Sequence, residues 1–100
     1  MYMMREVYQA ERGKVPELVA ALKVLDKAFE QAGYSNRRIF VDYDGPMDTM
    51  VYEFETESLD QYFSMERELF VNPDADTKAL IDAFNTNAKS GSRTIYEVIQ

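Results

Sequence analysis

The chain is 100 residues long and 46% hydrophobic, a size and composition that predict one domain spanning residues 1–100. Its 18 acidic and 11 basic residues give a net charge of −7 at pH 7, so we expect no nucleic-acid and no membrane partner. Because it has neither cysteine nor histidine, the sequence excludes disulfides, thiolate nucleophiles, histidine-ligated haem, zinc sites built on sulfur or imidazole, and histidine-based catalytic triads.

The N-terminal residues indicate the cellular compartment in which the protein is expected. Met1 to Tyr8 lack the long apolar core and the small-residue cleavage site of a signal peptide. No apolar run approaches the roughly 18 residues that a membrane span requires. We therefore expect a cytoplasmic protein.

Residues 2–10 are rich in Tyr, Met and Val and end at Glu11-Arg12-Gly13, which predicts a first strand closed by a glycine turn. The register of this strand is open, because a shift of one residue exchanges its two faces. The residues that point to the core are either Met3, Arg5 and Val7 or Met4, Glu6 and Tyr8.

From Val15 the apolar residues recur at spacings of three and four, which predicts an amphipathic helix that ends near Ala32. Pro16 suits the first turn, where its missing N–H has no partner to lose, and Gly33 supplies a left-handed residue after the last turn. The apolar stripe consists of Val15, Leu18, Leu22, Leu25, Phe29 and Ala32.

The stretch from Arg37 to Glu57 predicts a β-hairpin, because apolar residues alternate in both arms around a turn that contains Gly45-Pro46. The expected register pairs Tyr43 with Met50, Val41 with Tyr52 and Ile39 with Phe54. On the other face it pairs Arg38 with Glu55, Phe40 with Glu53 and Asp42 with Val51.

Two helical segments are expected next. Ser58 and Gln61 form a capping box for a helix over residues 59–70, and Asn72-Pro73 ends it. Asp74 or Asp76 then caps a second segment, whose periodic apolar residues are Ala79, Leu80, Ala83 and Phe84. Ser90-Gly91-Ser92 is expected to be a turn, and the β-branched and aromatic run over 93–99 predicts the last strand.

The resulting order is β-α-β-β-α-β with the second helix split, an α+β pattern that predicts a four-stranded antiparallel sheet with its helices on one side. The other sheet face would carry Phe40 and Val51 beside Arg38, Asp42 and Glu53. Such a mixed face suits a second sheet packed against it, so the sequence predicts a homodimer.

Three stretches carry a family resemblance: the hairpin from Val41 to Glu55, the segment from Glu57 to Tyr62, and the ending from Ser90 to Val98. They resemble the NIPSNAP-like branch of the dimeric α/β-barrel proteins. The resemblance implies a ferredoxin-like protomer that pairs into a dimeric barrel. The superfamily includes cofactor-independent antibiotic-biosynthesis-type monooxygenases, isomerases, chlorite-dismutase relatives and haem-degrading enzymes; haem-handling members rely on a histidine, which this chain lacks.

The candidate catalytic residues are Glu53 and Arg38. Beside Phe40 under a covering partner, Glu53 would be desolvated and suited to act as a general base, and Arg38 would hold a substrate anion. In the alternative interpretation, Arg38 pairs with Glu55 across the strands and Glu53 pairs with a basic residue such as Arg5 across the dimer interface.

The candidate ligand pocket lies between sheet and helices, where tyrosine hydroxyls would orient a flat apolar molecule. Its expected lining is Tyr43, Tyr52, Phe54 and Tyr96, and the alternative role of these residues is core and interface packing. Asp42, Asp44 and Asp48 do not match a calcium loop, and we expect no metal and no cofactor.

Three functions follow as hypotheses. The first is an uncharacterised NIPSNAP-like protein that binds a small apolar or aromatic molecule. The second is a cofactor-independent monooxygenase or isomerase acting on an aromatic or polyketide-like compound. The third is a non-catalytic structural or interaction role.

Overall fold

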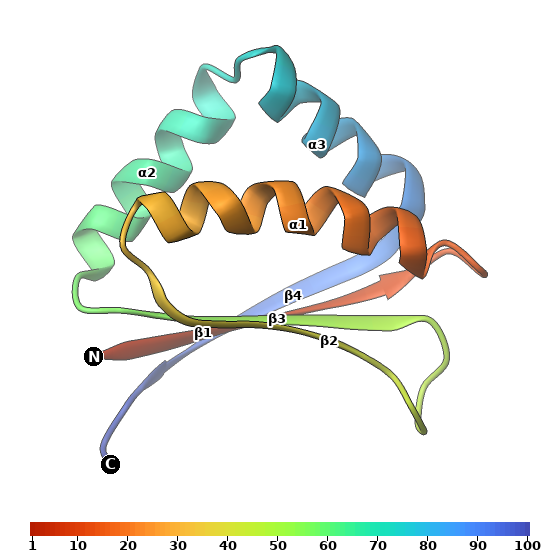
Figure 1. Ribbon diagram of the computed structural model, residues 1–100, viewed down its shortest axis with the longest axis horizontal. Helices are drawn as coiled ribbons and strands as arrows, with labels where there is room; N and C mark the ends of the chain where they lie inside the picture. The colour runs from red at the N-terminus through yellow and green to blue at the C-terminus, as the bar shows by residue number, and fades with distance from the viewer.

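The computed structural model describes residues 1–100 and has an α+β, ferredoxin-like fold. In chain order its elements are β1 (Tyr2–Ala10), α1 (Val15–Gln31), β2 (Ser35–Val41), β3 (Thr49–Thr56), α2 (Leu59–Val71), α3 (Ala75–Asn87) and β4 (Ala88–Glu97). The strands form one antiparallel sheet in the order β2-β3-β1-β4, and all three helices lie on one side of it (Figure 1). The predicted element order, the antiparallel sheet with its helices on one side, and the split second helix are confirmed.

The pairing of β1 settles which of its faces points to the helices. Met4 lies opposite Phe54 of β3 on one side and opposite Ile95 of β4 on the other. Met4 and Phe54 are fully buried, so the even-numbered residues of β1 point inward. Glu6 and Tyr8 therefore face the helices.

The core lies between α1 and the middle of the sheet. Tyr52 and Phe54 of β3 pack under the apolar stripe of α1, where the Phe29 ring stands edge-on to Phe54 with 4.9 Å between ring centroids. Full burial of these two aromatic side chains of β3 contributes strongly to the stability of the fold.

The hairpin register predicted from the sequence is wrong by two residues. Arg38 lies opposite Glu53 rather than Glu55, and Val41 opposite Met50 rather than Tyr52. The β2 strand ends at Val41 because Asp42 closes the turn, its Oδ1 accepting a hydrogen bond of 2.9 Å from the backbone N–H of Thr49. Because side chains alternate with period two, this slip leaves every residue on its predicted face.

The remaining expected pairs change in the same way. Ile39 lies opposite Tyr52 rather than Phe54, and Phe40 opposite Val51 rather than Glu53. Tyr43 and Asp42 lie beyond the strand, so neither forms its expected cross-strand pair with Met50 or Val51.

The last strand begins earlier than the sequence predicted. Ser90, Gly91 and Ser92, expected as a turn, are paired with β1, and β4 follows α3 directly at Ala88. A Cβ at position 91 would lie 3.0 Å from ring atoms of Tyr8, the residue opposite it. Glycine is accommodated in this strand because the Tyr8 ring occupies the space that a side chain would need.

Helices α2 and α3 form an inverted V beside α1, joined at Asn72-Pro73 (Figure 1). Ser58 caps α2 by accepting from the Gln61 N–H at 3.2 Å, and Asp74 caps α3 by accepting from the Thr77 N–H at 2.8 Å. Tyr62 is the one buried residue of α2, and α3 has none. These two helices, which we call the roof, therefore cover the sheet without packing tightly on it.

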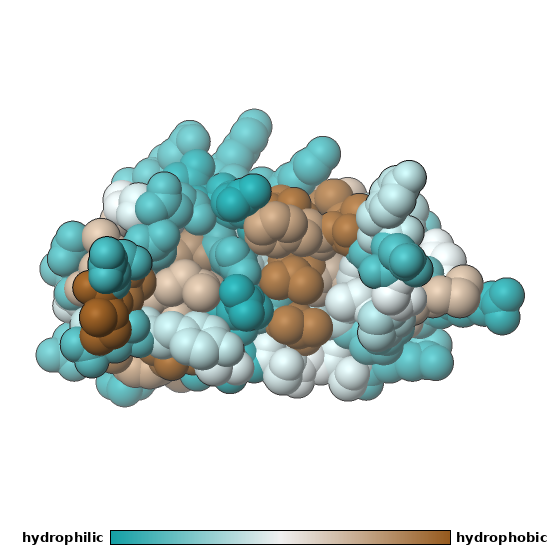
Figure 2. All heavy atoms as spheres, turned by 90° about the horizontal axis from the view of Figure 1, so that it is seen from below, coloured by the Kyte–Doolittle hydropathy of each residue, from teal (hydrophilic) through white to brown (hydrophobic).

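The sheet face opposite the helices is uncovered in the single chain. Phe40, Val51 and Val7 lie opposite one another on β2, β3 and β1 and form an apolar row across it. Figure 2 views this side and shows one group of hydrophobic side chains near its middle and another at one end, with neutral and hydrophilic side chains between and around them. The molecule measures 36 × 35 × 19 Å. None of its helices is both long and apolar enough to cross a membrane.

Candidate functional site

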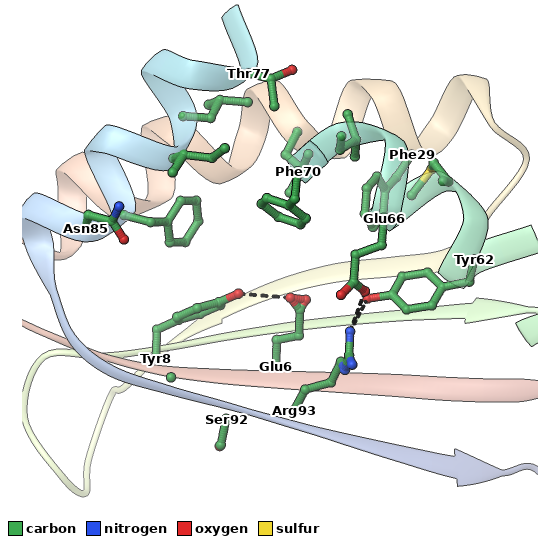
Figure 3. Close-up of a pocket in the computed structure, with 17 residues that line it drawn as sticks. Glu6, Tyr8, Phe29, Tyr62, Glu66, Phe70, Thr77, Asn85, Ser92 and Arg93 are labelled. Carbon is green, nitrogen blue, oxygen red and sulfur yellow. Dashed lines mark hydrogen bonds and ion pairs between the residues drawn. The ribbon is translucent and has the colours of Figure 1, made fainter. Parts of the chain in front are cut away.

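A cavity of about 530 Å³ lies between the roof and the half of the sheet formed by β1 and β4 (Figure 3). This volume is in the range of small-molecule sites. It is lined by Glu6, Tyr8, Leu25, Phe29, Tyr62, Met65, Glu66, Leu69, Phe70, Thr77, Leu80, Ile81, Phe84, Asn85, Gly91, Ser92 and Arg93. Apolar side chains of the helices form most of the wall, and the charged groups converge on the sheet side.

Glu6 and Tyr8 stand on the floor of the cavity, side by side on β1 (Figure 3). The Tyr8 hydroxyl donates a hydrogen bond of 2.9 Å to Oε1 of Glu6. The Tyr8 ring lies over Gly91 and packs on Phe84 of α3, with 5.0 Å between the ring centroids. The missing side chain at Gly91 thus leaves room for the ring whose hydroxyl contacts the carboxylate.

Arg93 of β4 lies opposite Glu6 in the strand pairing, so the two side chains share a face of the sheet. Its Nη1 donates to the Tyr62 hydroxyl at 2.9 Å and also to Oε2 of Glu66, and both acceptors belong to α2. This contact ties the roof to the sheet on one side of the cavity. It also leaves Glu6 outside the ion pair, since none of the ion pairs in the molecule includes Glu6.

The cavity changes the acidity of its titratable groups. Burial raises the pKa of the Glu6 carboxyl above its ordinary value, while the hydrogen bond from Tyr8 and the positive charge of Arg93 lower it. Burial also raises the pKa of Tyr8, as does the neighbouring Glu6, and burial is the main cause of the raised pKa of Tyr62. Both phenols therefore stay protonated at neutral pH, and Glu6 binds a proton more readily than an exposed glutamate.

The four aromatic residues expected to line a ligand pocket are not among those that line this cavity. Tyr43 lies in the hairpin loop and is fully exposed, and Tyr96 lies on the uncovered face, where the Arg5 guanidinium is 5.6 Å from its ring centroid. Tyr52 and Phe54 are fully buried in the core under α1. Periodicity indicated the correct face for Tyr52 and Phe54 but not their distance from the cavity, whereas Tyr96 lies on the face opposite to the one expected.

Glu53 and Arg38 lie on the uncovered face, across the sheet from the cavity. The guanidinium of Arg5 donates through Nε to Oε2 of Glu53 at 2.6 Å within the same chain, and Arg38 lies 4.8 Å from the ring centroid of Phe40. Glu55 accepts a hydrogen bond of 2.8 Å from Asn36 Nδ2. The alternative cross-strand ion pair between Arg38 and Glu55 is therefore not formed.

The functional candidates that sequence analysis did not select are Glu6, Tyr8 and Arg93. Placing Glu6 and Tyr8 in the site requires the register of β1, which the sequence left open between two choices. A glutamate on the face that carries Met4 is the available signal, because a charge among core residues of a strand needs an explanation. Arg93 was assigned only to the start of the last strand, and its place opposite Glu6 depends on pairing between distant segments.

No family model and no curated protein matches the chain. Solved structures do match. A NIPSNAP family protein of unknown function from Agrobacterium tumefaciens superposes with a TM-score of 0.78 at 14% identity, over 98% of this chain and 87% of its own. A second NIPSNAP family protein from Agrobacterium tumefaciens superposes with a TM-score of 0.76 at 20% identity, over 96% and 90%.

A protein from Nitrosomonas europaea, provisionally described as an antibiotic biosynthesis monooxygenase, has a TM-score of 0.77 at 14% identity, with full coverage of both chains. The fold of this chain is therefore that of NIPSNAP family proteins and of proteins related to antibiotic biosynthesis monooxygenases. This confirms the resemblance noted in the sequence at the level of fold, and fold by itself does not carry function.

Proposed function

We propose that this chain binds a small, largely apolar or aromatic molecule in the cavity between its roof and its sheet. The observation that carries the proposal is the cavity itself, which has helix-borne apolar walls and a few polar groups gathered on one side. That distribution is typical of small-molecule sites, where apolar surface supplies affinity and a few polar groups fix orientation.

We also propose that the protein is a cytoplasmic homodimer in which two uncovered sheet faces pack together. The apolar row of Phe40, Val51 and Val7 supports this assembly, and so does the family resemblance, which implies a dimeric barrel. A dimer would bury Glu53 and Arg38 at its interface, which is the setting in which the sequence analysis gave them catalytic roles.

Binding of the neutral fluorophore N-phenyl-1-naphthylamine tests the proposed site. Leu80→Trp, on α3, is expected to weaken binding about tenfold, because the larger side chain takes up the apolar surface that the probe would bury. Val24→Trp, on the exposed side of α1, is the matched control and is expected to bind as the wild type does. Equal affinity for all three proteins, or no binding by the wild type, would contradict the proposal and favour a structural or interaction role.

A second candidate function is a cofactor-independent monooxygenase or isomerase acting on an aromatic or polyketide-like compound. The observation that favours it is the desolvated carboxylate of Glu6 inside the cavity. The provisional description of the Nitrosomonas europaea protein points to the same class. Turnover without metal, flavin or haem that is lost in Glu6→Gln, and retained in Glu53→Gln, would place the chemistry in the cavity; the opposite pattern would support Glu53 with Arg38.

A further inference from the structure

The carboxylate of Glu6 is arranged unlike the other inward-facing groups of the sheet. It faces an apolar cavity, accepts a hydrogen bond from the neutral Tyr8 hydroxyl, and belongs to no ion pair. Its cross-strand neighbour Arg93 is instead paired with Glu66 of α2. A carboxylate in this position has oxygen lone pairs available for a proton on a bound molecule.

From this arrangement we propose that Glu6 is a general base that enolises a neutral, flat carbonyl compound bound in the cavity. The inference rests on the proposed ligand site. Arg93, opposite Glu6 on β4, supplies the positive charge that favours the enolate, and Tyr8 orients the carboxylate through its hydrogen bond.

The proton transfer balances without any further reactant. An oxygen of the Glu6 carboxylate takes a proton from a carbon next to the carbonyl, so a C–H bond breaks and an O–H bond forms. The electron pair of the broken bond delocalises onto the carbonyl oxygen as an enolate. Return of the proton from Glu6 to the same carbon completes an exchange, and return to a conjugated carbon completes an isomerisation.

The charges around the cavity select the class of substrate. Glu6 of β1 and Glu66 of α2 are acidic, Arg93 of β4 is basic, and the phenols of Tyr8 and Tyr62 are neutral at pH 7. With two carboxylates against one guanidinium, the cavity disfavours an anionic substrate. The apolar walls favour a compound with one carbonyl group on a flat hydrocarbon frame.

Exchange of the acidic C1 protons of 2-tetralone in D₂O, followed by proton NMR, tests the proposal with a defined probe. The wild type is expected to accelerate exchange about 100-fold over Glu6→Gln, the lower end of what a positioned general base supplies. Glu53→Gln, which alters a carboxylate on the other face of the sheet, is expected to match the wild type. Glu6→Asp is expected to retain part of the acceleration.

Binding of 2-tetralone is measured separately, by saturation-transfer NMR on the same samples. If Glu6→Gln binds the probe as the wild type does and has lost the exchange, the role of Glu6 as base is supported. Binding by the wild type with no acceleration over Glu6→Gln overturns the general base and leaves the ligand site standing. Failure of the wild type to bind 2-tetralone overturns both.

Discussion

At the scale of single residues, burial and the neighbouring charge of Arg93 shift the pKa of Glu6 in opposite directions. Burial raises its pKa above the ordinary glutamate value, so the folded chain holds a proton at this site at pH values where the unfolded chain has released it. Stability from this group is fully present below the unfolded pKa and is lost as pH rises through the folded pKa. Ionisation of Glu6 as the pH rises therefore lowers the stability of the fold.

Because ionisation of Glu6 lowers the stability of the fold, we expect Glu6→Gln to raise the melting temperature at pH 7. The increase should shrink towards about pH 3, below the ordinary glutamate pKa of about 4.3, where the wild-type carboxyl is itself protonated in both states. Glu53→Gln is the control, since it removes a carboxylate that is paired with Arg5 and should give no such increase. Melting curves of the three proteins at both pH values check the prediction, and a lower melting temperature of Glu6→Gln at pH 7 would contradict it.

Tyr52 is fully buried, and its hydroxyl group has one hydrogen-bond partner. Its hydroxyl donates to Oδ1 of Asp26 on α1 at 2.8 Å. Tyr52→Phe keeps the ring packing and removes this bond, so we expect a loss of about 1–2 kcal/mol in the free energy of unfolding. Tyr43→Phe, in the exposed loop, should leave it unchanged. Urea denaturation of both variants decides, and equal stabilities would mean that the bond is energetically neutral.

At the scale of elements, α2 depends on the cap at its first turn. Ser58→Ala removes the oxygen that accepts from the Gln61 N–H and should lower the free energy of unfolding by about 1 kcal/mol. Ser64→Ala, at an exposed position within α2, should be neutral or slightly stabilising, because alanine has the higher helix propensity. A cap variant as stable as the Ser64 variant in chemical denaturation would show that packing alone holds α2 in place.

Local chemistry predicted the helices and the first strand well, because each of their ends is set by residues adjacent in sequence. Ser58 and Gly33 lie at helix ends as expected, and of the two candidate caps of α3, Asp74 is the one that caps it. The hairpin register and the start of β4 depend on contacts between segments. Asp42 closes the turn on Thr49, and Gly91 is strand rather than turn because a Tyr8 ring from another strand lies over it.

The candidate site was less accessible from the sequence for the same reason. A pocket between sheet and helices was expected, and its position follows from the fold class. The residues that line the pocket depend on where α2 and α3 stand away from the sheet. The spacing of apolar residues along the sequence does not give this separation. Tyr52 and Phe54 alternate on the correct face, yet α1 covers them closely, whereas the wider space lies over Glu6 and Tyr8.

At the scale of the whole molecule, a single sheet with helices on one side leaves its other face for a partner. Val51 lies at the middle of the apolar row, between Val7 and Phe40. A face-to-face pairing on the order of 1,600 Å² in total would be of standard size for a stable protein interface.

We therefore expect the wild type to elute with twice the chain mass of 11.6 kDa in light-scattering chromatography. Val51→Lys should shift the mass to that of one chain, since it places a charge in the middle of the interface. Val24→Lys, at an exposed position of α1, should leave the dimer intact. A monomeric wild type at about 100 μM, or a dimeric Val51→Lys variant, would contradict the assembly.

The weak packing of the roof has a kinetic consequence. With Tyr62 as its one buried residue, the α2–α3 unit can unfold or swing away locally at a free-energy cost below that of the sheet and α1, so its amides should exchange with solvent sooner than theirs. Because side chains of α2 and α3 form much of the cavity wall, a molecule bound there would stabilise these helices and slow the exchange of their amides.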